Sequence, residues 1–117
     1  MARHNQTGKD GEELAAKWLA DNGYTLLHRN WRHGNWEIDV IASKGKRLHI
    51  VEVKTRRGNN FGYPEENMDH KKMQYLINAA EEYMYLDPQW QQLQFDILAI
   101  TISKERTDYF LIEDVYL

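Results

Sequence analysis

Three carboxylates and a lysine interrupt two apolar stretches of this 117-residue sequence. Glu37 and Asp39 lie in residues 36–42, and Glu52 and Lys54 lie in residues 48–54. Charged side chains are rarely buried unless a partner or a metal balances them. Carboxylates set close together are hard oxygen ligands that suit Mg²⁺ or Mn²⁺, and a neighbouring lysine would place a positive charge beside the metal. The residue types therefore predict a divalent-metal site.

The two stretches that carry these residues are rich in β-branched and apolar side chains and read as strands. Residues 43–47 between them are polar and include a glycine, which predicts a hairpin. Because side chains alternate along a strand, Glu37 shares a face with Asp39, and Glu52 shares a face with Lys54.

The turn decides whether these two faces coincide. A turn over residues 44–47 places Asp39 opposite Glu52 and Glu37 opposite Lys54, and a slip by two residues still keeps all four on one face. A three-residue turn would separate them, since a one-residue slip reverses the face. We expect the register that keeps them together.

These residues also carry a resemblance to known proteins. Asp39, followed thirteen residues later by Glu52-Val53-Lys54, resembles the split signature of the PD-(D/E)XK nuclease superfamily. Across the whole chain the sequence is similar to the YraN-like family, small bacterial proteins regarded as predicted endonucleases and related in fold to archaeal Holliday-junction resolvases. The matching positions, in chain order, are Gly11-Glu12, Ala15-Ala16, Asn30-Trp31-Arg32, Glu37-Ile38-Asp39, Val51-Glu52-Val53-Lys54-Thr55-Arg56, Phe61-Gly62, Lys72 and Phe95-Asp96.

The resemblance implies a restriction-endonuclease-like core and assigns roles to the charged residues. Asp39 and Glu52 would hold Mg²⁺ or Mn²⁺, with Glu12 as an additional carboxylate and the backbone carbonyl of Val53 as a further ligand. Lys54 would orient or help deprotonate the attacking water and stabilise the extra negative charge of the transition state. Judged from the residues alone, the favoured reading of Glu12, at the edge of a helical apolar face, is a stabilising first-turn charge on the helix dipole.

Basic residues are concentrated in the middle of the chain. Residues 28–57 carry net charge +5 and the remainder −8, for an overall charge of −3. Such asymmetry predicts a phosphate-contacting face on a protein that is acidic overall, although a solvated charged surface would look the same. The expected phosphate contacts are Arg29, Arg32, Arg56 and Arg57, with Lys72 either reaching the site or a phosphate or remaining a surface lysine.

The remaining pattern predicts a single α/β domain spanning residues 1–117, with a mixed five-stranded sheet flanked by helices in the order α-β-β-β-α-β-β. Residues 1–9 are expected to be loose, and a helix capped by Asp10 follows. A second helix, capped by Asn67 or Asp69, carries a stripe of Met73, Leu76, Ile77, Ala80 and Met84. Residues 55–64, directly after the strand that carries Glu52 and Lys54, read as a loop that either closes over the substrate or only connects two elements.

Two tryptophans admit two readings each, and one aspartate is assigned a structural role. Trp31 and Trp36 could stack on a base or sugar, but large aromatic side chains usually serve packing, which we favour. Asp96, inside a predicted buried strand, is expected to be a structural partner of a basic or backbone donor. The sequence has no cysteine, no apolar run long enough to span a bilayer and no signal peptide, so we expect a cytoplasmic protein.

The sequence thus predicts a metal-dependent endonuclease that hydrolyses phosphodiester bonds, in DNA rather than RNA, with branched or structured DNA as the substrate that the resemblance suggests. By the same analogy, an enzyme acting on branched DNA would need two sites and hence a homodimer. The alternative is a non-catalytic nucleic-acid-binding protein that keeps a nuclease fold. A weaker third reading treats the carboxylates as a structural ion-pair network with Lys54 and nearby arginines.

Overall fold

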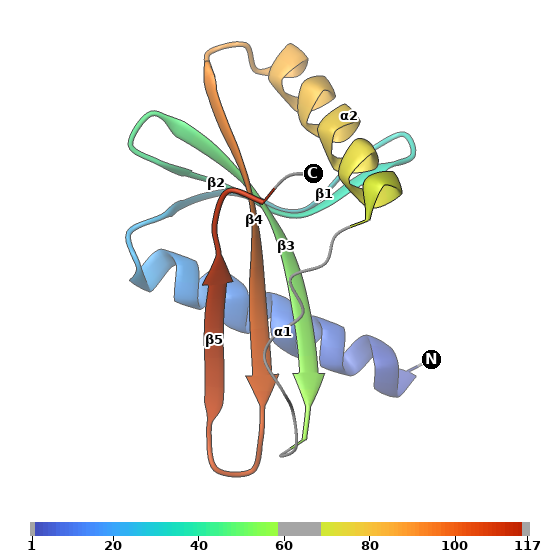
Figure 1. Cartoon of the computed structure of the whole chain (residues 1–117), viewed down its shortest axis with the longest axis vertical. Helices are drawn as coiled ribbons and strands as arrows, with labels where there is room; N and C mark the ends of the chain where they lie inside the picture. The colour runs from blue at the N-terminus through green and yellow to red at the C-terminus, as the bar shows by residue number, and fades with distance from the viewer. Residues whose placement is uncertain (1, 59–68, 116–117) are drawn as a thin grey trace.

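Five strands form one mixed sheet that separates two helices in the computed structural model, which describes residues 2–58 and 69–115 (Figure 1). The elements in chain order are α1 (Ala2–Asp21), β1 (Thr25–His33), β2 (Trp36–Lys44), β3 (Arg47–Arg57), α2 (His70–Leu86), β4 (Gln92–Ile102) and β5 (Thr107–Ile112). This is the predicted α/β class and element order, and it is consistent with a nuclease-like core. Within the described ranges, no helix combines the length and the apolar character needed to cross a membrane.

The strands lie side by side in sequence order, β1-β2-β3-β4-β5. All neighbours are antiparallel except β3 and β4, which are parallel and are connected through α2. A parallel pair needs such a crossover because the chain, having left the far end of the first strand, must return to the end at which that strand began before the next strand can start. The central strands β3 and β4 are therefore covered on both faces.

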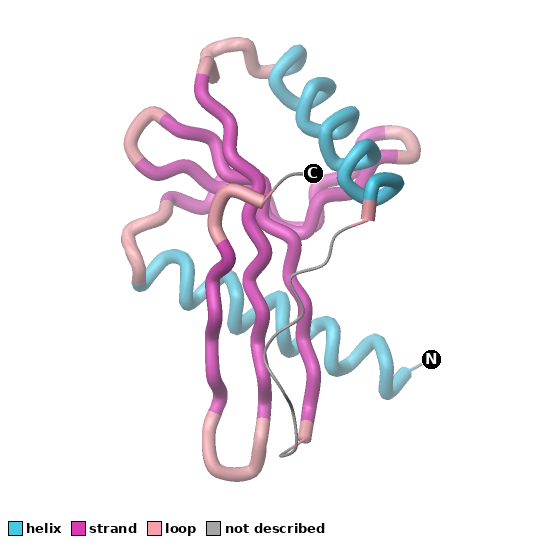
Figure 2. The backbone as a smooth tube through the Cα atoms, in the orientation of Figure 1, coloured by secondary structure: helices cyan, strands magenta, loops and turns pink. Residues whose placement is uncertain are grey.

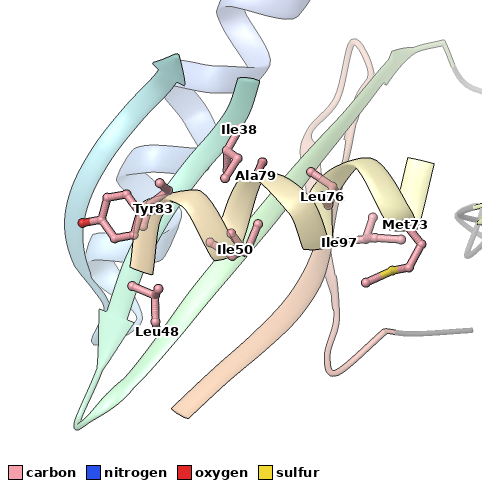
Figure 3. Packing of buried hydrophobic residues seen from close by; sticks show 10 residues of the cluster. Ile38, Leu48, Ile50, Met73, Leu76, Ala79, Tyr83 and Ile97 are labelled. Carbon is pink, nitrogen blue, oxygen red and sulfur yellow. The ribbon is translucent and has the colours of Figure 1, made fainter. Parts of the chain in front are cut away.

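Each face of the sheet packs against one helix. On one face, Ala15 and Leu19 of α1 pack with Val51 and Leu98. On the other face, α2 packs onto Ile50 and, as Figure 3 shows, onto further strand residues that include Ile38, Leu48 and Ile97. Neighbouring residues of β3 point to opposite faces, as the strand period of two requires.

The first helix begins earlier than the sequence predicted. Residues 1–9 were expected to be loose with a capping residue at Asp10, but α1 runs from Ala2. A polar segment without proline can form a helix, because helix formation depends on the backbone and no residue between 2 and 9 blocks it. Asp10 instead forms an ion pair with Arg57 of β3. The helix ends at Asp21, and Gly23 follows with φ +91° as the predicted stop.

The region after β3 corrects a second boundary. Residues 55–57 were expected to begin a loop, but Thr55 to Arg57 continue β3 and pair with residues 100–102 of β4. The rest of that expected loop, the Phe61-Gly62 match and the alternative cap Asn67 lie outside the described residues.

The second helix is close to its prediction. Asp69 is the N-cap, and its side chain accepts a hydrogen bond from the Lys72 backbone N–H. The predicted stripe is correct at three positions, Met73, Leu76 and Ala80, while Ile77 and Met84 are only half-buried. The helix is rotated so that Ala79 and Tyr83 complete the buried face (Figure 3).

Candidate functional site

The site begins where β2 and β3 part. The turn Lys44-Gly45-Lys46-Arg47 sets the predicted register, with Lys44 opposite Arg47 and Val40 opposite Val51. The pairing stops there, and β2 turns away toward the start of α2 while β3 continues straight (Figure 2). Asp39 and Glu52 are the next residues on the two diverging strands. Both carboxylates therefore lie side by side, as the register predicted, at the point where the sheet opens.

Asp39 bridges the gap between the parted strands. Its carboxylate accepts a hydrogen bond of 2.8 Å from the backbone N–H of Val53. A backbone donor at a point where strand pairing has ended needs a new acceptor, and the Asp39 side chain supplies it. The side chain is thereby directed at β3, beside Glu52.

The carboxyl group of Asp39 has a strongly altered proton affinity. Burial raises its pKa to about 7, helped by the negative charge of Glu52 and by a hydrogen bond between the two carboxyl groups. The Val53 hydrogen bond and the charge of Lys72 lower the pKa, but less than burial raises it. Two acids this close compete for protons or for a shared cation, and such pairs are concentrated at functional sites.

Lys72 brings a positive charge from α2 to this pair. Its Nζ lies 3.3 Å from Oε2 of Glu52, and the Glu52 side chain is only 16 % exposed. Nζ also lies 5.2 Å from the ring centroid of Tyr75, whose hydroxyl donates to the backbone carbonyl of Asn35. Lys72 therefore contacts the carboxylate pair, while its role at the site stays a prediction.

The predicted partner Lys54 is half-buried on β3, two residues after Glu52 and so on the same face. Its backbone lies next to Ala99 of β4 in the parallel register. Val53, between the two, contributes its N–H to Asp39, while its predicted role as a carbonyl ligand stays a prediction.

Glu12 lies on α1, the helix that packs against the other face of the sheet from α2 and Lys72. The helix approaches β3 so closely at Gly11 that an added Cβ would lie 1.9 Å from Oγ1 of Thr55. Glu12 follows, half-buried, and accepts a hydrogen bond of 3.2 Å from the side chain of Asn30, a residue of β1 with φ +53°. In the described part of the chain no three acidic or histidine side chains converge as a metal-binding group, so metal ligation by Glu12 stays a prediction.

The arginines expected to contact phosphates are paired with acids on the surface. Arg29 contacts Glu13 of α1 at 3.2 Å, and Arg57 contacts Asp10. Arg32 lies 3.5 Å from Glu37, its cross-strand neighbour. Because Glu37 is exposed and directed at Arg32, we assign it no role beside Asp39.

The aromatic and buried polar residues are structural, as favoured from the sequence. Trp31 and Trp36 pack against the α2 core, with edge contacts to Tyr83 and Tyr75. Asp96 is fully buried and accepts hydrogen bonds from the backbone N–H of residue 114, from Gln94 and at 2.7 Å from the His49 ring.

The contact between His49 and Asp96 was not predicted from the sequence. A histidine inside an apolar strand could have signalled it, because a buried imidazole needs a hydrogen-bonding partner.

Comparison with known sequences places the chain in a family. A profile of the uncharacterised protein family UPF0102 matches residues 11–100. The chain belongs to this family. A UPF0102 protein of Bacteroides thetaiotaomicron is 44 % identical over 86 % of this chain and 83 % of its own length. Those of Flavobacterium psychrophilum and Persephonella marina are 41 % and 42 % identical, over 93 % and 80 % of this chain and 90 % and 81 % of their own lengths.

The donor set of this UPF0102 protein fits a divalent cation. Asp39 and Glu52 offer carboxylate oxygens at one point, and burial together with the negative charge of Glu52 raises the pKa of Asp39. Mg²⁺ is commonly held by one or two carboxylates together with water and substrate phosphate, which this pair could provide. The fit rests on two carboxylates, with the Val53 carbonyl and Glu12 as the further predicted ligands.

Proposed function

We propose that this UPF0102 protein is a metal-dependent endonuclease that hydrolyses phosphodiester bonds in nucleic acid. The observation that supports it most is the half-buried pair of Asp39 and Glu52, where burial, together with the negative charge of the second acid, raises the pKa of Asp39 to about 7. DNA, in branched or structured form, is the substrate that the resemblance to PD-(D/E)XK nucleases favours.

In this proposal Asp39 and Glu52 hold Mg²⁺ or Mn²⁺ together with the backbone carbonyl of Val53, and Glu12 assists. The bound ion supplies Lewis-acid activation of the phosphodiester and of water. Lys54 donates hydrogen bonds that orient the attacking water and stabilise the negative charge that develops on the phosphate. The Val53 N–H fixes Asp39 in place, so that its carboxylate need not reorganise when substrate arrives.

The surface arginines supply the phosphate contacts, and their present partners do not prevent this. Arg32 and Glu37, with side chains 72 % and 47 % exposed, form an ion pair of a kind that is worth about 0–1 kcal/mol. A phosphate can therefore replace the carboxylate of Glu37, or that of Glu13 beside Arg29, at small cost. Arg56 and Arg57 at the end of β3 extend the same set of contacts.

Cleavage of labelled DNAs tests the proposal. The panel contains single strand, duplex, flap and four-way junction, each with Mg²⁺, Mn²⁺ or EDTA. We expect cation-dependent cutting by the wild type and at least about 100-fold slower cutting by Asp39→Asn and Glu52→Gln. Asp21→Asn, which removes an exposed acid at the end of α1, is the matched control and should cut like the wild type.

The outcome also separates the rival function. Binding of these DNAs without cutting, unchanged in Asp39→Asn and Glu52→Gln, would replace the proposal by a non-catalytic nucleic-acid-binding protein. A preference for the four-way junction would predict two sites in one particle, which size-exclusion chromatography with light scattering would show as a homodimer.

A further inference from the structure

Lys72 occupies the place where the proposed site most needs positive charge. It lies in the first turn of α2, and its backbone N–H is held by the Asp69 cap. Its ammonium group meets Glu52 at 3.3 Å and the Tyr75 ring at 5.2 Å. The cap thus holds the backbone of Lys72, while Glu52 and Tyr75 contact its ammonium group.

The contact with Glu52 differs from the ion pair of Lys17 with Asp21 on α1. Lys17 and Asp21 form an exposed pair on one helix, with side chains 76 % and 62 % exposed. The Glu52 side chain is 16 % exposed, and that of Lys72 is 42 % exposed. Glu52 is thus fixed and largely shielded from water, whereas Lys72 keeps access to solvent and a flexible four-carbon stem that can move.

We propose that Lys72 is the resident counter-cation of the site. It neutralises Glu52 when no divalent ion is bound, it competes with the incoming ion for that carboxylate, and it moves to a substrate phosphate once the ion is in place. The inference rests on the metal site of the proposed function and adds that metal binding depends on the displacement of Lys72 from Glu52.

Electrostatics give the reason for the competition. A divalent ion bound by Asp39 and Glu52 would lie within a few ångströms of the ammonium group, where like charges repel. The ion must therefore displace Lys72, and the displacement weakens its binding. A phosphate offers the displaced ammonium group a new partner, so nucleic acid and metal should favour each other's binding.

Calorimetric titration of the protein with MgCl₂ and MnCl₂ alone, without nucleic acid, tests the inference. We expect Lys72→Gln to bind the ions about tenfold more tightly than the wild type, because the competing charge is gone while the carboxylates remain. Lys72→Arg keeps the charge and should bind no more tightly than the wild type. Lys71→Gln removes a charge from the adjacent exposed position and should stay within about twofold of the wild type.

A second measurement needs no metal. In EDTA at pH 8, Lys72→Gln should unfold at a lower urea concentration than Lys71→Gln, since Lys72 pairs with the largely shielded Glu52 while Lys71 is exposed. Equal ion affinities for the wild type and Lys72→Gln would overturn the counter-cation while leaving the metal site intact. Failure of every variant to bind Mg²⁺ or Mn²⁺ would overturn the metal site, and with it the inference.

Discussion

Replacing Asp39 by asparagine should stabilise the protein in the absence of metal, and more so as the pH rises. Asparagine keeps the shape of aspartate, and its carbonyl oxygen can still accept the hydrogen bond from Val53. The substitution removes only the charge that burial and Glu52 disfavour. The change in unfolding free energy therefore measures how strongly this acid resists ionisation in the fold.

The magnitude follows from the two pKa values of Asp39, 3.8 as the reference and about 7 in the folded protein. Because the folded state holds the proton more tightly, it binds more protons than the unfolded chain between these values and loses stability as the pH rises through that window. The raised pKa destabilises the fold, relative to an aspartate with the reference pKa, by about 1.5 kcal/mol at pH 5 and by about 4 kcal/mol at pH 8. The advantage of Asp39→Asn should grow by roughly 2–3 kcal/mol between these pH values.

Urea unfolding followed by circular dichroism, in EDTA at pH 5 and pH 8, gives the two free energies. Asp21→Asn, at an exposed position, should show a difference from wild type below about 0.5 kcal/mol at both pH values. If the wild type is as stable as Asp39→Asn at pH 8, or if the stability advantage of Asp39→Asn shrinks as the pH rises, burial and the charge of Glu52 do not raise the pKa of Asp39 and the reasoning is refuted.

Two further substitutions test the packing that positions the site. Gly11→Ala should destabilise the protein by about 1–3 kcal/mol in urea unfolding, because the new Cβ meets Thr55. Gly8→Ala is the control and should not destabilise it, because no atom lies within 4 Å of the added Cβ. Similar values for both variants would contradict the close approach of α1 to β3. Asp96→Ala should cost about 3–5 kcal/mol in the same assay, because it leaves the buried His49 ring and two other donors without an acceptor, and a loss below about 1 kcal/mol would show that this network is not needed.

The register of the site was predictable because it depends on local chemistry. A glycine-containing turn between two alternating stretches leaves few pairings, and the strand period of two then puts Asp39 next to Glu52. The parting of β2 and β3 after Val40 and Val51 was not predictable, since it follows from the twist of the whole sheet and from the packing of α2 against its face.

The contacts made by the helices show where sequence reasoning ends. Lys72 could be placed at the start of a helix by its cap, but its meeting with Glu52 depends on where the crossover between β3 and β4 lays that helix. The buried face of α2 was partly mispredicted for the same reason. Whether Ile77 or Ala79 is buried depends on how the helix packs against the strands beneath it. The pairs of Arg29 and Arg57 with α1 also join residues that are distant in sequence.

The central claim is that Asp39 and Glu52 form a divalent-metal site, and a crystal structure grown with Mn²⁺ tests it most directly. The anomalous scattering of manganese identifies the ion independently of water. The account predicts a peak within bonding distance of both carboxylates, with Lys72 moved away from Glu52. A structure at saturating Mn²⁺ with no peak there, and with Lys72 still paired to Glu52, would contradict it.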